Sequence, residues 1–135
     1  MAALTPAVRR PVVLDAGALR DAEKNPNGRT WALCRAEVAQ NRTPLLPILL
    51  LAQMWRGGAR QAGLARVVRL CEIVNIDEPM SRRIGALLAT TGTSDIVDAM
   101  VVLVALDTGA AVLTSDPGDI TKLAALGANL RLITL

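Results

Sequence analysis

Short apolar runs alternate along the chain with longer segments that end at Gly, Pro, Asn or Thr. Runs rich in Val, Leu and Ile predict strands at 11–14, 45–46, 71–76, 110–114 and 129–135. The segments between them predict helices at 17–22, 29–40, 47–56, 61–70, 79–89, 95–107 and 117–126. Continuous apolar strands separated by helices are typical of a parallel sheet covered on both faces. We therefore expect one domain over residues 1–135, a three-layer α/β/α sandwich with a central parallel sheet.

Two aspartates come directly after predicted buried strands. Asp15 ends the first strand, and Asp116 follows the strand at 110–114 after one serine. Parallel strands end at one edge of a sheet, where open α/β folds place their sites. Each Asp could also simply cap the next helix, with Pro117 as the first helical residue after Asp116. Thr114 and Ser115 could hydrogen-bond a ligand carboxylate or hold the strand end.

Asp95 and Asp98 lie three residues apart at the start of a predicted helix, so they share a face. Two carboxylates there repel each other unless a cation lies between them, although the helix N-terminus offsets about 0.3–1 kcal/mol per charge. Asp98 also begins a segment that is apolar nearly all round, and an acid in a buried helix needs a partner. This pair favours a site. Asp119 is an alternative donor, but its position in a helix after Pro117 favours a solvated carboxylate.

The composition narrows the chemistry of such a site. Hydrophobic residues make up 52% of the chain, which argues against disorder. His is absent, which excludes a Ser-His-Asp triad and a His-ligated zinc site. Cys34 and Cys71 lie far apart in apolar surroundings, which favours buried thiols over a disulfide. Carboxylates without His or Cys are the ligand set of Mg²⁺ or Mn²⁺, and a metal-dependent nuclease is the natural hypothesis.

The net charge of +3 fits weak attraction to a polyanion but does not require it. Trp31 could stack a base, although a core position is the simpler interpretation. No signal peptide is evident, and the longest apolar run, 45–54, is too short to span a bilayer. We therefore expect a cytoplasmic protein with no membrane partner. Spaced arginines could line an RNA path or form a solvated helix face: Arg56, Arg60, Arg66 and Arg69.

Four motifs together resemble a known family: V-V-L-D-A-G-A-L, L-A-Q-M-W-R-G-G, S-D-I-V-D-A-M-V-V-L-V-A and A-V-L-T-S-D-P-G-D. In order and spacing they are similar to the PIN domain, in particular the VapC-type toxins of toxin–antitoxin pairs, over about 12–135. The resemblance implies a PIN-like sandwich and a Mg²⁺- or Mn²⁺-dependent endoribonuclease that cleaves RNA with a metal-activated water. It also implies a homodimer inhibited by a small antitoxin protein. The family's first, third and fourth acids correspond to Asp15, Asp98 and Asp116.

The chain departs from this family at Gln53, where the pattern has a glutamate. Gln53 can line the site and orient a ligand but adds no charge, and Asp95 could restore the missing negative charge. The departure favours the alternative of a catalytically weakened or inactive PIN-like domain that binds RNA or a protein. A phosphoryl-transfer receiver or phosphatase also uses strand-end aspartates, but no Asp-x-Asp follows the first strand.

Overall fold

The computed structural model of the chain describes residues 11–115, 118 and 130–135. Five strands lie in these ranges: β1 (Val12–Leu14), β2 (Leu45–Pro47), β3 (Glu72–Val74), β4 (Ala111–Thr114) and β5 (Arg131–Thr134). The described helices are α1 (Ala16–Lys24), α2 (Arg29–Ala39), α3 (Ile48–Met54), η3 (Ala59–Gln61, a 3₁₀ turn), α4 (Ala62–Leu70), α5 (Glu78–Thr91) and α6 (Ile96–Thr108).

The five strands form one sheet in the order β3-β2-β1-β4-β5, and every neighbouring pair is parallel. β1 is central: Val13 is in register with Leu45 of β2 and with Val112 of β4. Because all strands run in one direction, their carboxyl ends share one edge. The predicted parallel sheet is confirmed.

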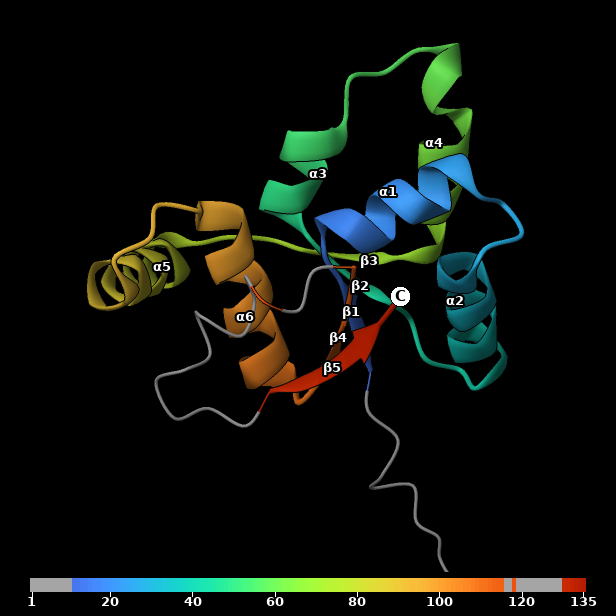
Figure 1. Cartoon of the computed structure of the whole chain (residues 1–135). Coiled ribbons are helices and arrows are strands. Elements are labelled where there is room, and N and C mark those ends of the chain that lie inside the picture. Colours follow the sequence, from blue (N-terminus) through green and yellow to red (C-terminus); the bar gives the residue numbers. More distant parts are fainter. Residues whose placement is uncertain (1–10, 116–117, 119–129) are drawn as a thin grey trace, which may run out of the picture.

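Helices cover both faces of the sheet, as the α/β/α prediction requires (Figure 1). Side chains alternate along β1, so Val12 and Leu14 face one layer and Val13 faces the other. Val12 and Leu14 pack in a core cluster with side chains of α1, α2 and α4, whereas Val13 and Val112 pack with α5 and α6. The core is therefore two aliphatic layers, one on each side of the sheet.

Several element ends differ from the prediction. Pro47 is the last residue of β2 and the N-cap of α3, with φ −61° and ψ 135°, and is not the first helical residue. With this extended backbone, Pro47 is still in register with Val74 of β3. Proline has no backbone N–H, and at a strand end this costs the sheet little. The η3 turn was not predicted. The predicted helix at 117–126 lies almost wholly outside the described residues.

Two helices on one face of the sheet are joined by a surface ion pair. Arg83 of α5 donates two hydrogen bonds, of 2.7 and 2.8 Å, to the carboxylate of Asp107 at the end of α6. These bonds from Arg83 hold the pKa of Asp107 below its ordinary value. No single helix in the described ranges is long and apolar enough to cross a membrane; α5 and α6 together, bent by 110°, meet the length and composition of a broken span.

Cys34 and Cys71 are both free thiols in the layer that contains α2 and α4, as predicted. Cys34 is buried and Cys71 is half-buried. Burial raises the pKa of the Cys34 thiol to about 11 and that of the Cys71 thiol to about 12. Since the thiolate is the reactive form, both side chains are poor nucleophiles at neutral pH.

We expect alkylation by iodoacetamide at pH 8 to be about 100-fold slower for Cys34 and about 1000-fold slower for Cys71 in the folded protein than in the urea-unfolded chain, because folded-state pKa values of about 11 and about 12 reduce the thiolate fractions by these factors. Mass spectrometry of timed samples measures the rates. The folded-state rates should rise with pH up to pH 10. Rapid labelling of Cys34 at pH 8 in native buffer would contradict its burial.

Candidate functional site

Asp15 lies at the centre of the edge where the parallel strands end. Its backbone N–H donates to the carbonyl of Leu113 at 3.1 Å, which fixes the residue beside the end of β4. Its Oδ1 accepts a hydrogen bond of 2.9 Å from the N–H of Ala18, so Asp15 is the N-cap of α1. The residue is only 5% exposed. The cap interpretation is thus confirmed, and a carboxylate, which has two oxygens and several acceptor positions, can cap a helix and bind a cation together.

The end of β4 packs tightly against the beginning of α1. Thr114 is fully buried, and Ser115 is exposed. A β-carbon at Gly17 would overlap the Ser115 side chain, so only glycine fits at this position of α1. The sequence analysis did not identify Gly17. A glycine two residues after a strand-end aspartate was the available signal.

The first turn of α6 reaches the same edge of the sheet. Val97 packs in the cluster that contains Leu14 and Leu113, the last core residues of β1 and β4, although most of α6 packs on the opposite layer. Asp98 follows Val97 and is half-buried. The fold therefore brings Asp15 and Asp98 to one edge, although they are far apart in sequence.

Asp95 is the N-cap of α6. Its Oδ1 accepts hydrogen bonds of 3.0 Å from the N–H groups of both Val97 and Asp98. The predicted cap is confirmed, and the cap bonds orient the turn that carries Asp98. The role of Asp95 as a supplementary metal ligand stays a prediction.

Replacing Asp95 with alanine should lower the free energy of unfolding by about 1 kcal/mol, because two helix N–H groups lose their acceptor. Asparagine should restore most of that loss, since its side-chain oxygen also caps. Urea unfolding followed by circular dichroism measures both. If the alanine variant is as stable as the wild type, the cap contributes nothing. If asparagine weakens metal binding at unchanged stability, the charge of Asp95 contributes to the site.

Gln53 lies on α3, which begins directly after β2 and packs against α6. Its side chain is exposed. Figure 1 shows the beginnings of α1, α3 and α6 around the same end of the sheet. Gln53 is thus on one of the three helices that surround the strand ends, as its place in the sequence predicted.

Asp116 and Asp119 lie outside the described residues. Within the described ranges, no group of three His, Cys, Asp or Glu side chains comes together closely enough to hold a metal ion. Asp15 and Asp98 are the predicted ligands that the structure describes at the strand ends. Both offer hard carboxylate oxygens, the donor type that suits Mg²⁺ or Mn²⁺.

Trp31 belongs to the core and is not an exposed base platform. It is 8% exposed, and its Nε1 donates to the carbonyl of Ala22 at 2.8 Å. The guanidinium of Arg35 covers its ring at 5.2 Å from the centroid. The core interpretation of Trp31 is confirmed.

Comparison with known proteins gives one family and several structures. A family model described as the PIN domain matches residues 12–126. The first structure is VapBC2 from Rickettsia felis bound to a DNA fragment from its promoter, with a TM-score of 0.69 and 17% sequence identity. The match covers 92% of this chain and 98% of that chain. FitAB bound to the IR36 DNA fragment has a TM-score of 0.61 at 17% identity and covers 91% of this chain and 94% of its own.

PAE2754 from Pyrobaculum aerophilum has a TM-score of 0.55 at 17% identity and covers 91% of this chain and 83% of its own. At this identity the structural matches establish similarity of fold. A search of curated proteins finds no significant match.

Proposed function

Because the chain belongs to the PIN domain family, we propose that it is a Mg²⁺- or Mn²⁺-dependent endoribonuclease, the toxin of a VapC-type toxin–antitoxin pair. The observation that carries the proposal is the convergence of Asp15 and Asp98. One follows the central strand and the other begins a buried helix, yet both lie at the carboxyl edge of the sheet. A structural role alone does not require an acid at both positions.

Asp15, Asp98 and Asp116 are the proposed metal ligands. Asp116 lies outside the described residues but follows Ser115 directly in sequence. When bound, Mg²⁺ or Mn²⁺ would lower the pKa of a water and neutralise charge on the scissile phosphodiester. The chain's own part is to hold the carboxylates in place. The cap bond of Asp15 and the cap of α6 by Asp95 fix the two described acids before any ligand arrives.

Gln53, Thr114 and Ser115 are proposed to line the site. Thr114 is buried at the end of β4, and Ser115 meets Gly17 of α1. Gln53 presents a neutral amide from α3, which can orient a water or a phosphate oxygen by hydrogen bonding. These side chains position ligands and add no charge to the cation site.

The proposed partners are an RNA substrate, a small antitoxin protein and a second copy of the chain. The fold similarity to VapBC2 and FitAB supports the antitoxin. Two free thiols suit a reducing compartment, which supports a location in the cytoplasm. A short upstream gene for a DNA-binding protein with an amphipathic tail would strengthen the toxin assignment.

One observation favours a second candidate, a catalytically weakened or inactive PIN-like module that binds RNA or a protein. Gln53 stands where a charged ligand would strengthen cation binding. Incubating a transfer RNA pool with the protein in Mg²⁺, in Mn²⁺ or in EDTA distinguishes the two. The nuclease should give discrete fragments with either metal and none in EDTA. Intact RNA in all three, with binding retained, would support the second candidate.

A further inference from the structure

An apolar pocket of about 470 Å³ lies between α3 and α4. Its lining is aliphatic apart from one aromatic, Trp55, which follows the last residue of α3. Trp55 is 43% exposed. An indole half in water beside an apolar pocket is the kind of surface that proteins use for binding. The lining residues are Ile48, Leu51, Ala52, Trp55 and Val68.

The loop that carries this tryptophan is held rigidly by one side chain. The Oε1 of Gln61 accepts from the backbone N–H of Arg56 at 2.6 Å and of Gly57 at 2.9 Å. The Nε2 of Gln61 donates to the carbonyl of Met54 at 2.8 Å and to the carboxylate of Glu23 on α1 at 3.2 Å. The loop is therefore fixed before binding and tied to α1, which reduces the entropy that binding would cost.

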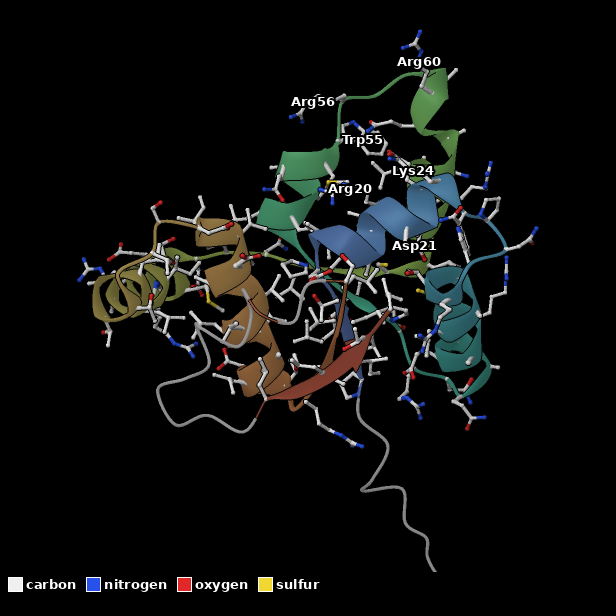
Figure 2. All side chains as sticks on the ribbon, in the orientation of Figure 1. Arg20, Asp21, Lys24, Trp55, Arg56 and Arg60 are labelled. Atoms are coloured by element: carbon white, nitrogen blue, oxygen red, sulfur yellow. The ribbon has the colours of Figure 1, made fainter. Side chains whose placement is uncertain are left out.

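Four exposed cations lie on elements that neighbour Trp55. Arg20 and Lys24 lie on α1, and Arg56 and Arg60 lie on the loop and the η3 turn. In the view of Figure 2, Arg20 is labelled between α3 and α1 and Trp55 between α3 and α4, Lys24 lies toward the end of α1 beside α4, and Arg56 and Arg60 point outward from the loop and the η3 turn. None of the four cations has an ion-pair partner within 4.0 Å in the part of the chain that the structure describes.

The guanidinium of Arg56 is held near the indole. It donates to the carbonyl of Trp55 at 2.7 Å and of Ala52 at 3.4 Å. A guanidinium has five N–H donors, so these two bonds do not use up its capacity for a phosphate.

Two acids, Asp21 and Glu23, lie on the same helix as Arg20 and Lys24 and offset part of their charge. Glu23 accepts the hydrogen bond from Gln61. Asp21 accepts from Asn25 at 2.8 Å and from the backbone N–H of Thr30 at 3.2 Å. Burial opposes the ionised form of Asp21, but the hydrogen bonds from Asn25 and Thr30 outweigh it and lower the pKa of Asp21. Four cations and these two acids leave an excess of positive charge on this part of the surface.

We propose that this surface, the Trp55 platform (Trp55 with Arg20, Lys24, Arg56 and Arg60), binds single-stranded RNA. An unpaired base stacks on the indole over the apolar pocket, and the four cations contact the phosphates on either side. A duplex does not fit, because its bases are stacked on each other and offer no free face. The inference rests on the proposed function and names the form of RNA that reaches the site.

Two features favour RNA over a protein occupant. The platform continues into the proposed site, since Arg20 is five residues from Asp15 along α1, a rise of about 7.5 Å. Its charge also opposes that of a phosphate chain. A second copy docked by the same face would bring the four cations toward their own equivalents. An acidic amphipathic helix is the competing occupant, and the experiment includes it.

The binding test uses a fluorescein-labelled single-stranded RNA of about 12 nucleotides in EDTA, where no cleavage occurs. Trp55→Ala should weaken binding about 5- to 100-fold, the range for loss of one stacked base. Trp55→Phe keeps an aromatic face and should retain most of the affinity. Unlabelled RNA should quench the Trp55 part of the intrinsic fluorescence and leave the Trp31 part, because Trp31 is buried and cannot contact a base.

The salt dependence of binding tests the cations separately. Removing one phosphate contact should reduce the slope of log K against log salt by about 0.7 for a single strand. Arg20→Gln, Lys24→Gln and Arg60→Gln should each do so. Arg82→Gln is the matched control, because Arg82 is an equally exposed arginine on α5 that pairs with Glu78.

Unchanged RNA affinity in Trp55→Ala overturns the inference, and so does equal affinity of the wild type for duplex RNA. If Trp55→Ala instead converts a dimer to a monomer in sedimentation, or loses only an acidic amphipathic peptide, with RNA affinity intact, the occupant is a protein. Failure of the proposed function looks different. If the wild type binds single-stranded RNA through Trp55 but cleaves none with Mg²⁺ or Mn²⁺, the nuclease proposal is refuted and the Trp55 platform is retained.

Discussion

Replacing Asp98 with asparagine should reduce Mg²⁺-dependent cleavage of a transfer RNA pool by about 100-fold or more. Loss of an outer-shell partner of a metal ligand already costs about 10- to 100-fold, so loss of a charged ligand should cost at least as much. Asparagine has the shape of aspartate and leaves the cap of α6 by Asp95 intact. The change therefore removes charge with little effect on the fold. Gel analysis of initial rates measures the loss.

Asp77→Asn is the matched control. Asp77 is the N-cap of α5, where its side chain accepts from the N–H of Met80 at 2.8 Å, and asparagine caps equally well. It lies beyond β3, the outermost strand on its side of the sheet. Cleavage by this variant should match the wild type. Persistent cleavage in Asp98→Asn with a normal unfolding curve would remove Asp98 from the site.

The strands were predictable because a strand buried on both faces is a continuous apolar run. β1 and β4 each consist of core residues, and their sequences show little else. Asp15 was found because it is the first polar residue after the apolar run of β1. The positions of Asp15 and Asp98 at one edge follow from a parallel order that the alternating pattern already indicated.

Other features depend on contacts that no local pattern contains. Gly17 is required by the approach of Ser115, nearly a hundred residues later in the chain. Gln61 looks like any polar residue at a helix start, yet it fixes a loop through four hydrogen bonds. The sequence also did not predict that Trp55 is exposed. It contains two tryptophans, and only the packing shows that Trp31 is buried and Trp55 is not.

The fold places the side chains of the proposed site but does not determine its total charge. Asp15 is buried and Asp98 half-buried at the strand ends, so both carboxylates lie where water is partly excluded. Gln53 contributes nothing to that attraction. A divalent ion at the proposed site would be held by fewer negative charges than the resemblance to the toxin family implies, so we expect its affinity to be weak.

Gln53→Glu should therefore tighten Mn²⁺ binding roughly tenfold or more, because even at the dielectric constant of water a unit charge about 4–6 Å from a divalent ion contributes about 1.4–2 kcal/mol. Calorimetric titration measures the affinity, and cleavage at limiting metal should rise in parallel. Gln40→Glu is the matched control, since Gln40 is exposed at the end of α2, which leads to the start of β2 at the opposite edge of the sheet. If Mn²⁺ affinity increases equally in both variants, the increase comes from the net charge of the protein and not from a position at the cation site. No change in Gln53→Glu would place Gln53 outside the cation site, and the retained aspartates would then have to hold the metal without any contribution from α3.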